Sequence, residues 1–177
     1  MNPMRNYVLM LATVLSSALP ALSAAQSNTQ VDWVKFLECR AKFEEYTSFA
    51  LGDLQDEQFK KSIGLKQIKQ ANSFIQEYEL AKAIDVYGYS TKRLAFTSSG
   101  VMAIVNEKNP VQLAEKLQLS VEYNRGGKIL ATKTISETKP ETIGGMQVWQ
   151  KISKDLSTVT SHPGKVLVGC SYAPMTK

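Results

Sequence analysis

The stretch KVLVGCSYAPM, residues 165–175, reads as an apolar strand with a cysteine at its centre. A short run of valine, leucine and tyrosine that follows a proline- and glycine-containing turn is typical of a buried strand. The chain has two cysteines, so Cys170 of this strand can pair only with Cys39. The state of this pair decides how the N-terminal part of the chain is attached to the rest of the fold.

The first 25 residues have the order of a secretory signal peptide. Arg5 and the terminal amine precede an apolar run from Tyr7 to Leu19, and a proline and several small residues follow it. This run is shorter than the about 20 residues that a membrane-spanning helix needs, which argues against a retained anchor. We expect cleavage after Ala25 and export of residues 26–177 to the periplasm or the medium, with no stable membrane insertion after cleavage.

The composition of the exported part points to a globular protein with a mild positive charge. Removing 25 of the 177 residues leaves 152, the size of one ordinary domain. The leader takes one basic residue and no acidic residue with it, so the formal net charge falls from +5 to +4. The basic residues are spread along the chain, which gives no footprint for nucleic acid. A positive charge of this size suits an acidic partner and an anionic envelope surface equally well, and it also suits a protein with no partner, which is the commonest case.

Export also predicts the state of the two cysteines. In an oxidising compartment two cysteines usually pair, so we expect a disulfide between Cys39 and Cys170. By chain-entropy reasoning, a loop of this size stabilises the fold by about 4–5 kcal/mol. Two distant cysteines and one histidine do not have the spacing of a metal site, and we expect no metal and no cofactor. A nucleophilic cysteine would need His162 as its base, and His162 lies in the turn-like sequence SHPGK.

Residues 31–51 have the periodicity of one helix. Apolar side chains recur there at steps of three and four residues, which predicts a single apolar face. They are Phe36, Cys39, Phe43, Tyr46 and Ala50. Gly52 marks the expected end of this helix, and a second short helix is expected near residues 54–61. Cys39 on the apolar face would be placed to meet a buried strand.

The pattern changes to short strands after residue 73. Four segments rich in branched and aromatic residues, separated by turn residues, predict an antiparallel meander, although the Glu and Gln content of the first segment leaves a helix open there. They are FIQEYEL (74–80), AIDVYGY (83–89), KRLAFT (92–97) and GVMAIVN (100–106). Asn109 and Pro110 then have the residue types of an N-cap and a first helical residue, which predicts a short helix.

The last third of the chain predicts a hairpin and two further strands. QLSVEYN (118–124) and ILATKTI (129–135) alternate on either side of the turn RGGK. MQVWQKI (146–152) would place Met146, Val148, Gln150 and Ile152 on one side, and Trp149 on the other. Residues 153–165 are expected to be a linker before the closing strand. We therefore predict an α+β fold, with an N-terminal helix packed on an antiparallel sheet of short strands and one disulfide.

The chain has none of the common catalytic motifs. G-x-S-x-G, H-E-x-x-H, a phosphate-binding glycine loop and paired C-x-x-C motifs are all absent from the sequence. A Ser–His–Asp arrangement would have to use His162, the one histidine. A pair of acidic side chains, as in glycosidases, stays open because sequence does not reveal which carboxylates converge. A non-enzymatic protein is therefore the favoured expectation.

Two predicted turns carry residues of the types that anchor protein interfaces. Tyr87, Tyr89 and Arg93 surround the first turn, and Tyr123 and Arg125 the second, beside Lys128. By analogy of general character, we expect a periplasmic inhibitor or immunity protein that neutralises an envelope-acting hydrolase or toxin. One alternative is a carrier of a small lipid or glycan, which would need an apolar pocket between helix and sheet. The other is a hydrolase that uses an acidic pair.

Overall fold

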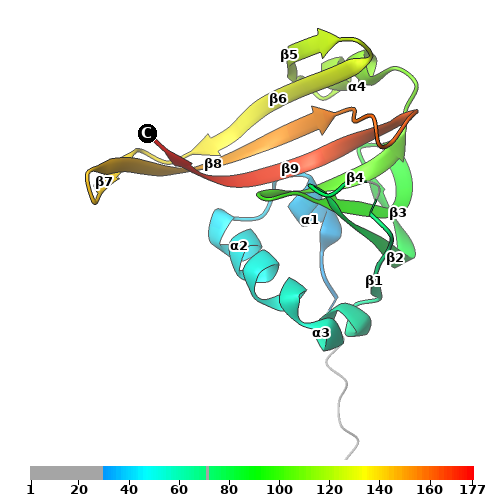
Figure 1. Ribbon diagram of the computed structural model, residues 1–177, viewed down its shortest axis with the longest axis horizontal. Coiled ribbons are helices and arrows are strands. Elements are labelled where there is room, and N and C mark those ends of the chain that lie inside the picture. The colour runs from blue at the N-terminus through cyan, green and yellow to red at the C-terminus, as the bar shows by residue number, and fades with distance from the viewer. Residues whose placement is uncertain (1–29, 71) are drawn as a thin grey trace, which may run out of the picture.

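The computed structural model describes residues 30–70 and 72–177, and within them one antiparallel sheet of nine strands runs through the molecule (Figure 1). The short helices α1, α2 and α3 lie against one face of this sheet. The predicted signal peptide, residues 1–25, lies outside the described residues. No helix in the described part of the chain is long and apolar enough to cross a membrane.

The N-terminal region forms several short helices. They are α1 (Trp33–Leu37), α2 (Phe43–Leu51), the 3-10 turn η1 (Asp53–Gln55) and α3 (Glu57–Ser62). The prediction of one continuous helix over residues 31–51 is therefore wrong. The predicted end at Gly52 is confirmed, because Gly52 caps α2, and α3 corresponds to the predicted second helix.

The helix breaks at Cys39 because α1 ends there in a Schellman turn. The Arg40 N–H donates to the Lys35 carbonyl at 2.9 Å, and the Cys39 N–H donates to the Phe36 carbonyl at 3.3 Å. This pattern places Cys39 in the left-handed conformation, with φ +60°. Glycine usually takes this position, and a cysteine there gives no sequence signal for a helix end.

The strands and the last helix follow in chain order. They are β1 (Leu65–Gln67), β2 (Gln76–Val86), β3 (Tyr89–Phe96), β4 (Gly100–Asn106), α4 (Pro110–Lys116), β5 (Ser120–Arg125), β6 (Lys128–Glu137), β7 (Glu141–Ile143), β8 (Met146–Ser157) and β9 (Lys165–Thr176). The strand order is β1-β2-β3-β4-β9-β8-β6-β5, with β7 paired to β8. The chain is mostly β, so the α+β prediction is only partly confirmed: the antiparallel sheet and the disulfide hold, and the long N-terminal helix does not.

Several strands are longer than the sequence pattern indicates. Most of the predicted segments 74–80 and 83–89 is joined in one strand, β2, through an irregularity between Glu79 and Ile84, and Tyr89 already begins β3. β8 continues to Ser157, so the expected linker shrinks to residues 158–164. Polar residues on the second side of these strands interrupt the apolar pattern. A count of apolar residues therefore underestimates the length of the strands.

The hairpins are confirmed where the turn residues are diagnostic. Gly126 and Gly127 connect β5 and β6 with φ +59° and +75°, and Arg125 pairs with Lys128 across the turn. Two successive positive φ values define the type I′ turn that suits the twist of a hairpin. The predicted start of α4 is confirmed too, since the Asn109 side chain accepts from the Gln112 N–H and Pro110 opens the helix.

Side chains pack on both faces of the sheet. The main core lies between the sheet and the helices, where the ring of Tyr46 from α2 stacks on Tyr172 from β9 at 4.3 Å between centroids. A smaller apolar cluster lies on the opposite face and comprises Ile75, Ala95, Met102, Ile104 and Leu167. The loop between β8 and β9 covers this second cluster with Val159.

The disulfide between Cys39 and Cys170 is confirmed, with 5.3 Å between the Cα atoms. It joins the turn after α1 to the strand β9, which lies in the middle of the sheet between β4 and β8. The cross-link closes a segment of 131 residues, for which chain entropy gives about 4–5 kcal/mol of stabilisation.

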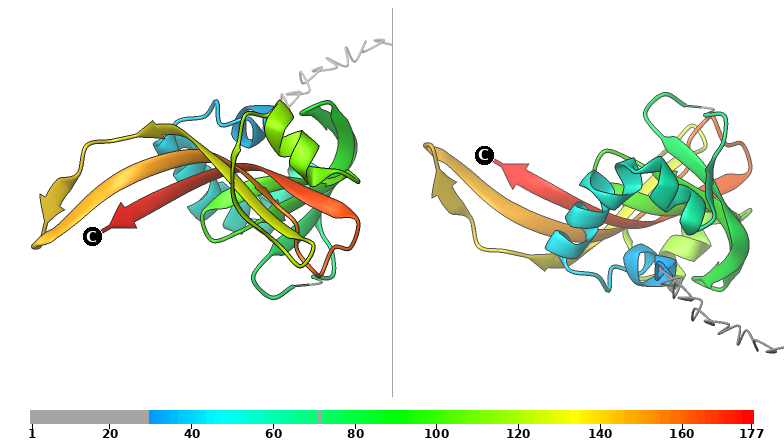
Figure 2. Two further views of the ribbon diagram at one scale, coloured as in Figure 1. Left: turned by 90° about the horizontal axis from the view of Figure 1, so that it is seen from above. Right: turned by 90° about the horizontal axis from the view of Figure 1, so that it is seen from below.

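The far ends of β6, β8 and β9, together with β7, form an arm that projects from the rest of the molecule (Figure 2). Along β8, residues 146–148 pair with β7 and Lys151 pairs with Glu137 of β6, while residues 148–151 pair with β9 on the other side. Several large apolar side chains in this region are exposed, among them Ile143 and Met146 near the tip.

Candidate functional site: a lysine groove between three loops

Three connections at one end of the sheet enclose a groove of about 520 Å³. They are the segment between β4 and α4, the turn between β5 and β6, and the loop between β8 and β9. Lys108, Lys128 and Lys165, one from each connection, line this groove, which we call the lysine groove. The antiparallel topology brings these lysines together although they are far apart in the sequence.

Positive charge dominates the lysine groove. Glu107 is the one acidic side chain among the described residues that line it. One Glu107 carboxylate oxygen accepts from the Asn109 N–H at 2.6 Å, and the other accepts from the Tyr89 hydroxyl. The hydrogen bond from Tyr89 holds the pKa of Glu107 below its usual value, and the same bond raises the pKa of Tyr89 to about 12. Glu107 therefore stays ionised, but its oxygens are already used within the protein.

The walls of the lysine groove are fixed by contacts to the sheet. The ammonium group of Lys165 donates to the Asn106 side chain at the end of β4. The Thr158 hydroxyl donates to the Gly127 carbonyl at 3.2 Å, which ties the β8–β9 loop to the β5–β6 turn. Gly126 and Gly127 have no atoms within 4 Å of a position where a Cβ would lie, so the turn is open above the groove.

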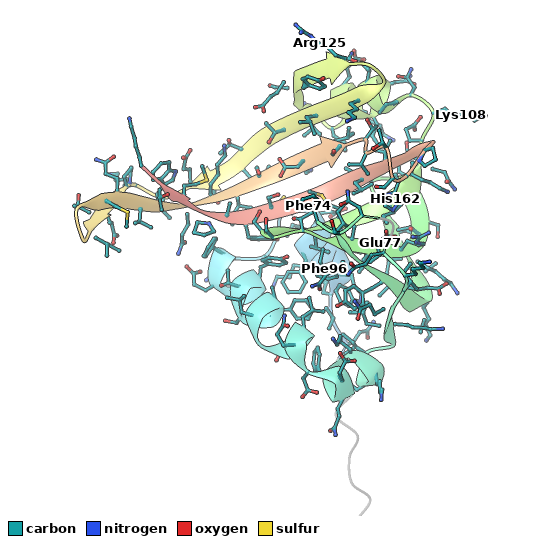
Figure 3. All side chains as sticks on the ribbon, viewed as in Figure 1. Phe74, Glu77, Phe96, Lys108, Arg125 and His162 are labelled. Carbon is teal, nitrogen blue, oxygen red and sulfur yellow. A yellow bond between two sulfur atoms is a disulfide. The ribbon has the colours of Figure 1, made fainter. Side chains whose placement is uncertain are left out.

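Behind one wall of the groove, Glu77, Arg93 and His162 form a polar cluster around the buried Glu77 carboxylate (Figure 3). The Glu77 side chain is fully buried in β2. One of its oxygens pairs with the Arg93 guanidinium from β3, and the other lies 3.1 Å from Nε2 of His162. His162 is buried as well, and it belongs to the loop that lines the groove.

His162 also contacts Ser161, so hydroxyl, imidazole and carboxylate lie in a row. Ser161 Oγ is 2.9 Å from His162 Nδ1, and Glu77 is on the Nε2 side. A hydrolytic site needs its nucleophile to face the space where a substrate binds. Ser161 is not among the residues that line the lysine groove, although its neighbours Thr160 and His162 are. The row is therefore best explained as the attachment of the loop.

Three of the predicted interface residues make contacts within the protein. The Tyr87 hydroxyl donates to the Leu37 carbonyl, and burial raises the pKa of Tyr87. The Tyr89 hydroxyl binds Glu107 at the rim of the lysine groove, and Arg93 pairs with buried Glu77. Each of these three side chains is thus already bonded within the protein. To bind a partner, it would have to share or break that bond.

Tyr123 and Arg125 have a different setting. Both lie on β5, the last strand of the sheet, where every residue is exposed. Arg125 pairs with Lys128 at the β5–β6 turn, so it stands next to the lysine groove. Tyr123 pairs with Leu130 on β6, and 43% and 48% of these two residues are exposed. An apolar and cationic surface therefore continues from the groove onto β5.

The sequence analysis does not identify Lys108 and Lys165 as site residues. Each stands beside turn residues, Lys108 before Asn-Pro and Lys165 after Pro-Gly. Lysine beside a turn is common on any surface, so the convergence of these cations becomes visible only once strand order is known.

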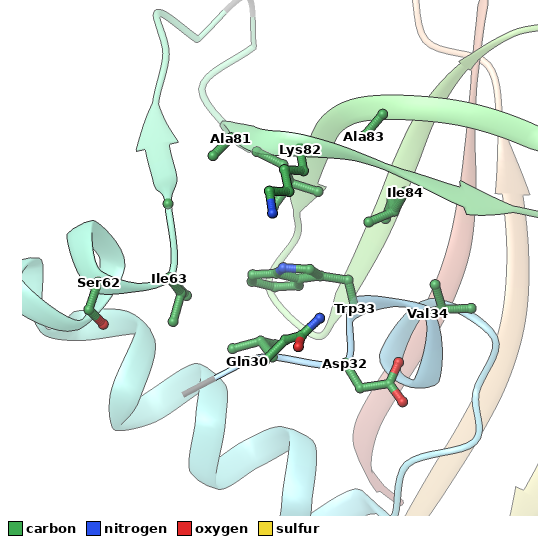
Figure 4. Close-up of a pocket in the computed structure, with 13 residues that line it drawn as sticks. Gln30, Asp32, Trp33, Val34, Ser62, Ile63, Ala81, Lys82, Ala83 and Ile84 are labelled. Atoms are coloured by element: carbon green, nitrogen blue, oxygen red, sulfur yellow. The ribbon is translucent and has the colours of Figure 1, made fainter. Parts of the chain in front are cut away.

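A second hollow, of about 730 Å³, lies between the helices and the exposed edge of β2 (Figure 4). The indole of Trp33 lies beneath the segment of β2 from Ala81 to Ile84, and Ile63 stands at one side. Asp32 and Lys82 also line this hollow, so its walls are both apolar and charged.

No group of three or more histidine, cysteine, aspartate or glutamate side chains in the described residues could hold a metal ion. The chain matches no protein-family model, and no curated protein or solved structure is significantly similar to it. Fold and site together define a disulfide-linked, mostly β protein with a cationic groove at one end of its sheet.

Proposed function

We propose that this protein is an exported, non-enzymatic protein-binding domain, and that it neutralises an envelope-acting hydrolase or toxin as an inhibitor or immunity protein does. An acidic segment of the partner would bind in the lysine groove. The observation that carries the proposal is the convergence of Lys108, Lys128 and Lys165 from three separate connections, beside the exposed Tyr123 and Arg125.

The chemistry of the groove favours carboxylates of a protein partner. Lysine presents a compact ammonium group on a flexible stem, which can adapt to carboxylates at irregular spacing. Tyr123 and Leu130 next to the groove offer apolar area that a protein could bury around the charged contacts. The mature net charge of +4 would accelerate the encounter with an acidic face at low salt.

A non-enzymatic role is supported by the state of the carboxylates. A glycosidase-type site places two carboxylates on either side of a cleft. The lysine groove has one, Glu107, and both of its oxygens accept hydrogen bonds from the protein. Glu77 is buried between Arg93 and His162. Both carboxylates are thus engaged in contacts within the folded protein.

Affinity capture tests the proposal. The mature domain is used as bait on an extract of the native envelope, and the partner is identified by mass spectrometry. In a test variant, Lys108, Lys128 and Lys165 are changed to Gln. In a matched control, the exposed Lys42, Lys66 and Lys139 are changed to Gln, which lowers the net charge by the same amount.

The proposal expects the control variant to retain the partner and the groove variant to lose it. Equal loss in both variants would mean that net charge alone attracts the partner. Retention by the groove variant would remove the lysine groove from the interface.

The hollow beside Trp33 favours a second candidate function, the carrying of a small lipid or glycan. Its position between helix and sheet is the one that a carrier requires, and its volume of about 730 Å³ is in the range of ligand pockets. Saturable binding of a small ligand that quenches Trp33 fluorescence, without capture of any protein, would favour this candidate over the inhibitor.

A further inference from the structure

The β8–β9 loop, residues 158–164, provides one wall of the lysine groove, and its contacts with the sheet determine where that wall stands. At its start, the Thr158 N–H donates to the Ile129 carbonyl at 3.0 Å. Near its start, Val159 packs on the apolar cluster of the second face. At its middle, His162 contacts the buried carboxylate of Glu77.

His162 is the residue of this loop that lies against a buried carboxylate. Its side chain is 5% exposed and that of Glu77 is fully buried, so little water reaches the space between them. The distance of 3.1 Å from Nε2 to Oε1 brings the imidazole against a carboxylate that Arg93 holds from the other side. Within the loop, the His162 N–H donates to the Val159 carbonyl and the Lys165 N–H donates to the His162 carbonyl. The backbone of His162 therefore sets the turn that delivers Lys165 to the groove.

We propose that His162 is a positioning residue for the lysine groove: its contact with Glu77 holds the β8–β9 loop in place as the wall of the groove beside Lys165, which is itself paired with Asn106 of β4. The proposal rests on the proposed function, because it concerns affinity at the same groove. A ligand would bind the ammonium groups, and His162 would act through the position of its loop.

The physical reason is the cost of leaving a buried charge with fewer partners. Removal of the imidazole takes away one of the groups that contact the Glu77 carboxylate. Water that enters beneath the loop would replace this contact. The loop would then open locally, held at its start by Val159 and Thr158. Opening would remove one wall of the groove and let water reach the ammonium groups, so an anion in the groove would bind less tightly.

Two measurements on the full mature protein test this inference. Hydrogen exchange, followed by mass spectrometry of the peptide over residues 158–165, reports whether the loop is held. Titration with poly-L-glutamate reports the affinity of the groove, and its salt dependence reports the number of cations in contact. His162→Ala removes the contact, His162→Gln keeps an N–H donor on the side chain, and Ser161→Ala leaves the contact between His162 and Glu77 in place.

The expected result for His162→Ala is exchange about tenfold faster in this peptide and a Kd for poly-L-glutamate about tenfold higher. Its salt dependence should match that of the wild type, because the same lysines make the contacts. His162→Gln should recover most of the affinity and protection, and Ser161→Ala should resemble the wild type. If His162→Ala is too unstable to measure, His162→Leu, which keeps an apolar side chain of similar size without an N–H donor, replaces it with the same expected result.

Two results would overturn the inference. Unchanged exchange in His162→Ala would mean that other contacts hold the loop. Faster exchange with unchanged affinity would mean that the loop position does not affect the groove. If wild-type protein binds no poly-L-glutamate, the acidic-partner function fails, and the exchange measurement by itself decides whether His162 holds the loop.

Discussion

Cys39 stands in the left-handed turn that ends α1, with φ +60°, and from that turn its side chain forms the disulfide with Cys170 in the middle of the sheet. The position thus combines a backbone conformation that favours glycine with a cross-link that requires cysteine. The cross-link attaches the helices to the sheet at the place where the N-terminal segment changes direction.

Removal of the disulfide should destabilise the protein strongly. Changing Cys39 and Cys170 to Ala opens the closed segment of 131 residues, and we expect the free energy of unfolding to fall by about 4–5 kcal/mol. Urea unfolding of the two proteins measures the difference. Mass spectrometry of non-reduced peptides provides the independent check, and two free thiols in protein from its native compartment would contradict the cross-link.

Glycine at the end of α4 should stabilise the protein. Gln118 has φ +57°, and the Leu119 N–H donates to the Ala114 carbonyl at 2.8 Å, which is again a Schellman turn. A non-glycine residue in this conformation is strained, so Gln118→Gly should raise the free energy of unfolding by about 0.5–1 kcal/mol. Gln112→Gly, inside the same helix, is the matched control and should lower it by about 1 kcal/mol. Equal effects of both changes would exclude relief of backbone strain.

Stability should decline in alkaline solution because of the tyrosines. Burial raises the pKa of Tyr46, Tyr87 and Tyr172, and the hydrogen bond to Glu107 raises that of Tyr89 to about 12. A hydroxyl whose pKa is higher in the folded protein contributes stability that is complete below the unfolded pKa of about 10 and is lost as the pH rises through the folded value.

Melting temperatures across this range provide the test. The wild type should lose stability from about pH 10 upward, and Tyr89→Phe should lose less of it between about pH 10 and 12. Identical pH profiles for the two proteins would show that the Tyr89–Glu107 bond makes no difference to folding.

The predicted interface residues should separate into two groups when changed to Ala. Tyr123 and Arg125 are exposed on β5, so their removal should weaken partner binding by about 2 kcal/mol and leave the melting temperature nearly unchanged. Arg93→Ala should instead lower the free energy of unfolding by about 1–3 kcal/mol, because it takes a partner from the buried Glu77. Calorimetry of binding and of unfolding distinguishes the groups, and a stable Arg93→Ala protein would refute the structural role of this ion pair.

The elements that sequence predicts well are those with local chemical signals. Gly126 and Gly127 predict a hairpin because few other residues accept two successive positive φ values. Asn109 and Pro110 predict the start of α4 for a similarly local reason. Cys39 gives no such local signal. The disulfide requires cysteine at a position where glycine would have indicated the end of α1.

The candidate site is less accessible to sequence because it depends on strand order. Lys108, Lys128 and Lys165 come together only through the pairing of β9 with both β4 and β8. The tyrosine and arginine clusters are visible in the sequence, but Tyr89 and Arg93 have bonding partners, Glu107 and Glu77, that lie on other elements. No local pattern predicts such contacts.

The place of β9 in the sheet has a consequence for the order of folding. β4 pairs with β9, and α4 and the strands from β5 to β8 all come between them in the chain. During synthesis from the N-terminus, β1 to β4 can form a meander before β9 has been made. One edge of β4 is then unpaired. Such non-local pairing makes folding slow, and an open edge invites association with other chains. We therefore expect a folding intermediate that is prone to association through the unpaired edge of β4. This intermediate ends when β9 pairs with β4 and brings Cys170 to Cys39.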